Sequence, residues 1–304
     1  MAAQLPWNRN LREQFAALPA TYVDRYDPDK IMVIDEYPAE YFRLEIIKRR
    51  VAGSGGTRIL DVGVGSGIPA VEIARQQNSQ HVVAFDATPE MVEFAQNQFA
   101  AAGLSPERVF LGDANATDPF SRAQLDAPFD IILVLGLAHH IENQDLFLRK
   151  LCDLLSPNGR VFISFRNKLF SLVTMNRFTH ALVCSELLGD DVPVNIVGVV
   201  DNDLQNRLRM DKPDLPELEA YSEASYETIQ ARKHNPLEVD PWFRALGYSN
   251  TRLHFYHYHP CTPYLEHSQV PREQFRRAAM KLEGSAADWR GHFLCSAFMV
   301  EATV

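Results

Sequence analysis

The sequence predicts an α/β protein whose core is a parallel, doubly wound sheet, and two observations indicate this fold. From about residue 57, short apolar runs of β type alternate with longer segments of helical pattern. A glycine-rich turn follows the first of these runs, in the segment 59–67 with the sequence ILDVGVGSG. Strands joined by crossovers long enough to hold a helix form parallel sheets with helices on both faces.

Five strands and three helices make up this alternation. We expect the strands at residues 58–62, 81–86, 108–111, 129–135 and 160–165. The helices are expected at residues 69–77, 89–102 and 143–155. Thr88-Pro89-Glu90 is typical of a capped helix start with proline in the first turn.

The other segments extend this core. The final third predicts two more strands, 251–259 and 292–302, joined by a charged helix at 272–281, for a sheet of about seven strands. Residues 168–239 are too long for a simple crossover, and their apolar beginning predicts a lid inserted after the fifth strand. We therefore divide the chain into an N-terminal helical cover (1–50), a core (51–167 and 240–304) and the lid.

Composition limits the classes of function. The formal charge of −9 argues against a nonspecific nucleic-acid binder, and no apolar run is long enough to cross a membrane. The four cysteines form no C-x-x-C pair, so we expect neither a disulfide framework nor a zinc site. The first ten residues lack the pattern of a secretory signal, and we expect a cytoplasmic protein with no bound metal.

The glycine turn marks the ligand site. Ligands of doubly wound sheets bind at the carboxyl ends of the strands, and glycine lets ligand atoms approach the backbone there. A dinucleotide fingerprint would place its third small residue at position 68, which is Ile68. The third glycine, Gly67, comes one residue early, which weakens the dinucleotide interpretation without excluding it.

At this point the chain resembles the class I S-adenosylmethionine-dependent methyltransferases. The resemblance rests on four motifs in order: the segment 61–67 (DVGVGSG), an acidic residue ending the second strand, the segment 112–114 (GDA) after the third, and the fourth strand through Gly136. The entry to the fifth strand, 154–161 (LLSPNGRV), also matches. The resemblance implies a Rossmann-like fold with an antiparallel last strand and S-adenosyl-L-methionine as the cofactor.

The resemblance also implies a set of cofactor-binding residues. Asp86 ends the second strand, where a carboxylate can accept hydrogen bonds from ribose hydroxyls. Asp113 and Ala114 match the position where family members contact adenine. The full expected set is Asp61, Gly63, Gly65, Gly67, Asp86, Ala87, Asp113, Ala114 and Gly136.

Two histidine pairs are candidates for catalysis. His139 and His140 follow the fourth strand, where family enzymes that act on adenine or glutamine nitrogen carry an Asn-Pro-Pro-Tyr segment that is absent here. One histidine of such a pair lines the pocket in many similar small-molecule enzymes, whereas the alternative is packing under the next helix. We favour His139, because Ile141 has the character of the inward residue.

The second pair, His257 and His259, lies near the end of a later strand. Alternation along a strand places both on the face of Leu253 and Phe255. If the strand runs parallel to the first five, both histidines project toward the acceptor. A metal pair and edge-strand packing are the alternatives, and no carboxylate at metal-ligand spacing accompanies them.

Four further residues are candidates for substrate binding. Arg166 and Asn167 end the fifth strand, and Arg166 either neutralises an acidic acceptor or forms an ion pair within the insertion. Tyr22 and Tyr26 belong to the tyrosine-rich N-terminal cover and are expected to close over the cofactor.

The motif order predicts an enzyme that transfers a methyl group to a small molecule, with oxygen favoured over nitrogen or carbon. We expect no nucleic-acid or membrane partner, and a homodimer would order the covers at both ends of the core. Two alternatives remain open: an NAD(P)-dependent oxidoreductase, or a methyltransferase-like partner subunit without catalytic activity.

Overall fold

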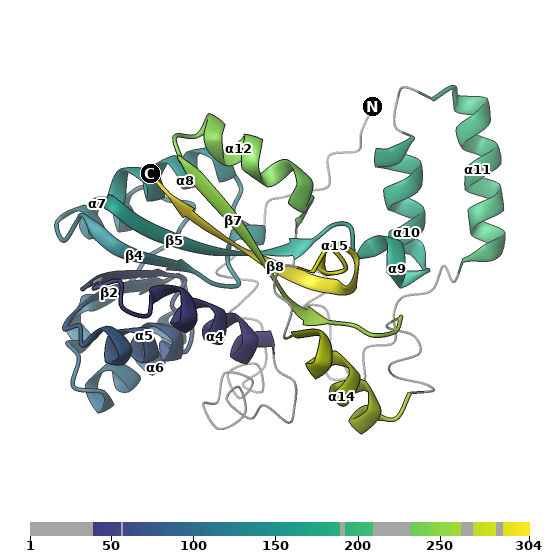
Figure 1. Cartoon of the computed structure of the whole chain (residues 1–304). Coiled ribbons are helices and arrows are strands. Elements are labelled where there is room, and N and C mark those ends of the chain that lie inside the picture. The colour runs from purple at the N-terminus through teal and green to yellow at the C-terminus, as the bar shows by residue number, and fades with distance from the viewer. Residues whose placement is uncertain (1–38, 56, 189–191, 209–231, 263–269, 284–287) are drawn as a thin grey trace.

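The computed structural model describes residues 39–55, 57–188, 192–208, 232–262, 270–283 and 288–304. Its centre is an eight-stranded sheet with the order β3-β2-β1-β4-β5-β8-β7, and β6 pairs with β5 off this path (Figure 1). The strands are β1 Arg58–Val62, β2 His81–Asp86, β3 Val109–Leu111, β4 Phe129–Val134, β5 Leu155–Asn167, β6 Lys233–His234, β7 Asn250–Tyr258 and β8 Cys295–Thr303.

Strand direction confirms the predicted doubly wound sheet. Strands β1 to β5 pair in parallel, whereas β8 lies antiparallel between β5 and β7. Strand β7 therefore runs in the same direction as β5, and its carboxyl end lies at the same edge of the sheet. The fifth strand begins earlier than predicted because Leu155 pairs with Phe129 ahead of a register shift.

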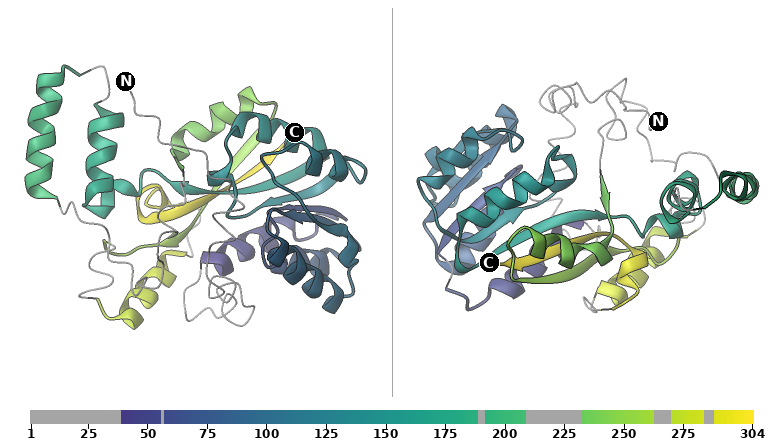
Figure 2. Two further views of the ribbon diagram at one scale, coloured as in Figure 1. Left: turned by 180° about the vertical axis from the view of Figure 1, so that it is seen from behind. Right: turned by 90° about the horizontal axis from the view of Figure 1, so that it is seen from above.

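Two apolar cores cover the two faces of the sheet. One core takes side chains from α7 (Asp118–Gln124), α8 (Gln144–Leu154) and α12 (Val239–Ala245). The other takes side chains from α4 (Ala39–Val51), α5 (Ile68–Gln77), α6 (Pro89–Ala101) and α14 (Arg272–Glu283). The views in Figure 2 show these two helix layers on opposite sides of the sheet.

Local chemistry explains where the core helices begin. The side chain of Asn143 accepts a hydrogen bond from the backbone N–H of Leu146 at 3.0 Å and so caps α8. Proline stands in the first turn of α6, as predicted, but the Thr88 side chain makes no capping hydrogen bond. The helix therefore begins where the sequence predicts, but the expected capping hydrogen bond from Thr88 is absent.

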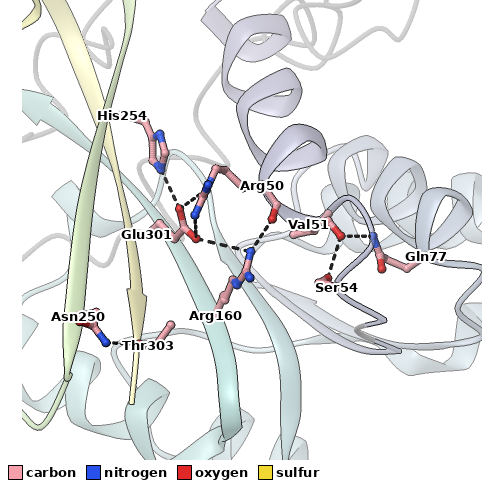
Figure 3. Close-up of polar contacts among 9 residues, drawn as sticks. All are labelled: Arg50, Val51, Ser54, Gln77, Arg160, Asn250, His254, Glu301 and Thr303. Atoms are coloured by element: carbon pink, nitrogen blue, oxygen red, sulfur yellow. Dashed lines mark hydrogen bonds and ion pairs between the residues drawn. The ribbon is translucent and has the colours of Figure 1, made fainter. Parts of the chain in front are cut away.

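Helix α4 is the described part of the expected N-terminal cover. It packs into the apolar core, and Arg50 near its end pairs with the buried Glu301 of β8 (Figure 3). Tyr22 and Tyr26 lie outside the described residues.

The described part of the expected lid contains three short helices and one longer helix beyond the sheet. They are α9 (Ser171–Thr174), α10 (Arg177–Leu182), a π-helix (Val183–Leu187) and α11 (Val194–Arg207). Helix α11 lies at the margin of the molecule beside α10 and has no buried residue (Figures 1 and 2). Two residues of the same segment, Lys233 and His234, form β6 at the carboxyl end of β5. Within the described ranges, no helix is both long and apolar enough to span a membrane.

Candidate active site

The glycine turn after β1 is held against the end of β2. The backbone N–H groups of Gly63 and Val64 donate to the Phe85 carbonyl at 2.9 and 3.1 Å. The Asp86 carboxylate accepts from the N–H of Gly65 and of Thr88, each at 3.0 Å. The Thr88 side chain and the Ala87 backbone also donate to this carboxylate, so these bonds together hold Asp86 in place beside the glycine turn.

The three glycines of this turn have different roles. All three have positive φ, at 75°, 50° and 75° for Gly63, Gly65 and Gly67. A Cβ atom on Gly63 would lie 2.9 Å from Leu137 Cδ2, and one on Gly67 would lie 3.2 Å from Ala95 Cβ. A Cβ on Gly65 would meet nothing within 4 Å. The backbone at Gly65 therefore borders open space, as a ligand-binding turn requires.

Two acidic groups beside this turn, Asp61 and Asp86, have raised pKa values. Burial raises the pKa of Asp61 to about 7; the positive charge of Arg43 opposes this rise, and the charge of Asp86 adds to it. Burial also raises the pKa of Asp86, against the hydrogen bonds from Gly65 and Thr88. A positively charged ligand group beside Asp61 would stabilise its ionised form.

The ends of β3 and β4 complete the expected cofactor region. The Asp113 carboxylate accepts from the N–H of Asn115 at 2.9 Å, and Asp113 with Gly112 lines a hollow of about 390 Å³. Ala114 is buried in the core beside it. Gly136 has φ 78° and donates its N–H to Ser164 Oγ at 2.7 Å. Ala87 donates its backbone N–H to Asp86.

His139 and His140 form part of a short 3-10 helix directly after β4. Their ring centroids are 4.0 Å apart, and both side chains are buried. Burial, followed by the nearby charges of His140, Arg166 and His234, holds the pKa of His139 well below its usual value. Among the described residues, Nε2 of His139 has no hydrogen-bond partner. The lowered pKa favours a neutral imidazole at His139.

The second histidine pair differs from its expected placement. The strand does run parallel to β5, but His257 has φ 58°, a left-handed conformation that interrupts strand alternation. Phe255 and Tyr258 consequently share one core, whereas the ring of His259 lies 5.9 Å from Phe275 in the other core. The expectation that both histidines share a face with Leu253 and Phe255 is therefore wrong.

The contacts of this second pair are mainly structural. His257 Nδ1 lies 2.9 Å from Ser296 Oγ on β8, and burial lowers the pKa of His257 to about 3. The ring of His259 lies 4.8 Å from that of Phe170. Strands β4 and β7 are separated by β5 and β8, so the two histidine pairs follow strands roughly 14 Å apart.

The side chain of Asn167 forms hydrogen bonds to backbone atoms at the end of β5 and before β8. Its amide nitrogen donates to the carbonyls of His292 and Cys295, both at 2.8 Å, and its oxygen accepts from Leu169 N at 3.0 Å. This buried amide fixes the end of β5 against the segment before β8. The structure therefore gives Asn167 a structural role in place of the expected substrate contact. Arg166 lies one residue earlier, near enough for its charge to lower the pKa of His139.

Several residues at this edge were not predicted from the sequence. Arg43 of α4 is charge-coupled to both Asp61 and His139. Its position as the single cation within the apolar helix segment 42–47 was a usable signal. Lys233 and His234 reach the edge only through β6, which no sequence pattern marks.

A separate group of possible ligands lies in the insertion. His180, Cys184 and Asp201 bring one ligand atom each within 4.8 Å of one another. His180 Nε2 lies 2.6 Å from Asp201 Oδ1, which joins α10 to α11. These three residues were not among the expected sites.

Comparisons with known proteins agree with this architecture. Residues 59–159 match a family model described as a methyltransferase domain. The chain is 30% identical over 176 residues to a ubiquinone biosynthesis O-methyltransferase of Xylella fastidiosa (strain 9a5c), a match covering 57% of this chain and 64% of that protein. It is 28% identical over 130 residues to a probable (S)-tetrahydroprotoberberine N-methyltransferase 2 of Papaver bracteatum, covering 43% and 34% of the two chains.

A solved structure supports the fold alone. A chain from the complex between the Haloferax volcanii Trm112 methyltransferase activator and the putative methyltransferase superposes with a TM-score of 0.51 at 12% identity. The superposition covers 94% of this chain and 98% of that chain. The sequence matches above span less than two thirds of those relatives' lengths.

The sheet order, the open glycine turn and the acid ending β2 define a nucleoside-binding domain of the methyltransferase class. The methyltransferase domain matched over residues 59–159, together with the methyltransferase relatives, supports a class I S-adenosylmethionine-dependent methyltransferase.

Proposed function

We propose that the protein transfers a methyl group from S-adenosyl-L-methionine to an oxygen atom of a small-molecule acceptor. The observation that carries the choice of oxygen is His139, a buried neutral imidazole whose Nε2 has no partner in the described part of the chain. An acceptor hydroxyl has a proton to lose, and a neutral imidazole is suited to take it.

The residues of the glycine turn suit the cofactor. The backbone at Gly65 leaves room for the ligand, and the oriented Asp86 carboxylate accepts from the ribose hydroxyls. Asp61 pairs with the positive charge of the methionine portion, which favours its ionised form. The bound cofactor supplies an electrophilic methyl group on sulfur.

The chain's own residues then position the acceptor and move its proton. The cofactor would supply the methyl carbon to the acceptor oxygen, and its sulfur would leave as a neutral thioether. The hydroxyl proton passes to Nε2 of His139, so the charges balance: a neutral ether and an imidazolium replace the hydroxyl and the sulfonium. Burial of His139 and His140 would limit the access of water to the reacting groups, and holding those groups in line would supply much of the rate.

The relatives support small-molecule chemistry without selecting one acceptor. One relative's name describes an O-methyltransferase and another's an N-methyltransferase. We also propose that Arg166 binds the substrate, that the protein is cytoplasmic and that it forms a homodimer. Light scattering of the purified protein would test the homodimer.

The first experiment is calorimetric titration of the purified chain with S-adenosylmethionine, NADH and NADPH. We expect binding of the sulfonium nucleoside alone, and preferential binding of a nicotinamide would overturn the proposal. Methyl transfer to a panel of phenols, alcohols and amines then separates an O-methyltransferase from a partner subunit. Cofactor binding without transfer to any acceptor would favour the inactive subunit.

A further inference from the structure

Three cationic side chains gather where β5, β6 and α10 meet. Arg166 of β5 and Lys233 of β6 are paired in register across the two strands. Lys233 Nζ lies 3.8 Å from the centroid of the Phe178 ring, and Arg177 Cζ lies 4.9 Å from the same centroid. Two cations from distant parts of the chain thus share one aromatic ring.

Among the described residues, the charges of Lys233 and Arg177 are not balanced by an ion pair. No carboxylate of the described residues lies within ion-pair distance of Lys233 or Arg177, and Nε of Arg177 is buried without a hydrogen-bond partner. The one polar side-chain contact described for Lys233 Nζ is Ser171 Oγ at 3.2 Å. Neighbouring Lys168, by contrast, pairs with Glu186 at 2.7 Å.

Burial beside other cations disfavours the charged form of Lys233. Burial, together with the charges of Arg166 and Arg177, lowers the pKa of Lys233 to about 8. An anion bound among these groups would remove that penalty and stabilise the charged ammonium. The chain as a whole carries a formal charge of −9, so a general excess of cations does not explain the cluster.

The cluster adjoins the proposed catalytic histidine. Arg166 and His234, the residue after Lys233, both act electrostatically on His139. The backbone N–H of Arg232 donates to the His139 carbonyl at 3.1 Å, which ties the segment before β6 to the 3-10 helix. A molecule with its hydroxyl at His139 therefore has cations within reach of its other end.

We propose that Lys233 and Arg177, assisted by the charge of Arg166, bind a carboxylate or phosphate group of the methyl acceptor. This inference rests on the proposed function, because it assigns the acceptor's anionic group to the same site. Ser171 Oγ would donate a further hydrogen bond to the anion, and Phe178 would hold both cations in place.

The test is calorimetric titration of the full chain, saturated with S-adenosylhomocysteine, with benzoate, benzamide and inorganic phosphate. Benzoate and benzamide have the same shape and differ in charge. We expect benzoate to bind at least about tenfold more tightly than benzamide, as one charge-assisted contact predicts. Phosphate binding without benzoate binding would assign the subsite to phosphate esters, and the converse to carboxylates.

Single substitutions test whether anion binding depends on Lys233 and Arg177 or on any nearby positive charge. Lys233→Gln and Arg177→Gln should each weaken anion binding about tenfold or more, and Lys233→Arg should restore most of it. Lys168→Gln, a nearby cation already paired with Glu186, should change it less than about twofold at 0.15 M salt. Measurable binding of benzoate and benzamide with equal affinity, or no binding of either benzoate or phosphate at about 10 mM, would overturn the subsite.

Cofactor titration of the same variants distinguishes the two proposals. Lys233→Gln should bind S-adenosylmethionine as the unmodified chain does. If the unmodified chain binds benzoate through Lys233 without binding S-adenosylmethionine, the proposed function fails and the anion subsite stands. If the unmodified chain binds S-adenosylmethionine and Lys233→Gln binds benzoate with the same affinity as the unmodified chain, the anion subsite alone fails.

Discussion

Arg50 and Glu301 lie 251 positions apart in the sequence and form a two-pronged ion pair. Nε of Arg50 donates to Oε2 at 2.6 Å, and Nη2 donates to Oε1 at 3.0 Å (Figure 3). His254 Nε2 lies 2.9 Å from the same Oε2, and Arg160 approaches Oε1 at 3.7 Å. The carboxylate of Glu301 therefore fastens α4, and with it the beginning of the described chain, to strands β5, β7 and β8.

Glu301→Gln should destabilise the protein. The substitution keeps the shape of the side chain but leaves Arg50 and Arg160 without their shared negative charge. Because the Arg50 side chain is 34% exposed, water compensates in part, and we expect the free energy of unfolding to fall by about 2 kcal/mol. Urea denaturation at pH 7 measures this change. Arg244→Gln, which breaks the exposed pair with Asp240, should cost less than about 0.5 kcal/mol, and equal losses would contradict the argument.

The same carboxylate predicts a dependence of stability on pH. Burial alone would raise the pKa of Glu301, but hydrogen bonds from His254 and Arg50 outweigh burial and hold it at about 2, below the ordinary 4.5. A depressed folded-state pKa stabilises the fold above pH 4.5, and this contribution disappears as the pH falls from 4.5 toward 2. The loss of unfolding free energy over this range should be smaller in Glu301→Gln than in the unmodified chain. Parallel curves for the two proteins would show that Glu301 is not the titrating group.

Asp86→Asn should weaken cofactor binding while the fold persists. The amide keeps the shape of the side chain but loses the charged acceptor for two ribose hydroxyls, together worth roughly 2 to 5 kcal/mol of binding free energy. Calorimetry with S-adenosylmethionine measures the affinity, and the melting temperature checks folding. Asp153→Asn, at an exposed position on α8, is the control and should bind normally. An unchanged affinity in Asp86→Asn would rule out the ribose contact.

Gly63→Ala and Gly65→Ala should fail in different ways. Both positions have positive φ, which costs an alanine about 1 kcal/mol or more. At Gly63 the new methyl group also meets Leu137 Cδ2 at 2.9 Å, so stability should fall further there. At Gly65 the methyl enters open space, so the main loss should be cofactor affinity. Thermal melting and calorimetry on both variants would show the contrast, and a Gly65→Ala variant with normal affinity would contradict a ligand at this turn.

The sequence predicts the sheet and the glycine turn well because each depends on neighbouring residues. Apolar runs, crossover lengths and the segment 59–67 are all local patterns, and the sheet follows from them. The fastening of α4 through Glu301 depends on residues 251 positions apart, for which one sequence offers no local sign. Lys233 reaches Arg166 through a strand of two residues, which is too short to show a period.

Local conformation limited the prediction in another way at β7. Alternation assumes extended backbone, but the φ of 58° at His257 changes which face the following residues occupy. Histidine adopts that conformation more often than most side chains but far less readily than glycine, so the residue type alone does not predict it. The catalytic candidates after β4 were predicted because they directly follow a strand end, where the fold itself places the site.

His139→Ala should remove most of the methyl transfer without affecting cofactor affinity. A positioned base contributes about 10²- to 10⁴-fold, and kcat should fall by an amount in that range. His81→Ala, at the exposed start of β2, is the matched control and should keep full activity. Because the pKa of His139 lies well below 6.5, its neutral form persists as the medium becomes acidic, and kcat of the unmodified enzyme should begin to fall only well below pH 6.5. A kcat that halves near pH 6.5, or a His139→Ala variant with normal kcat, would assign the proton to another group.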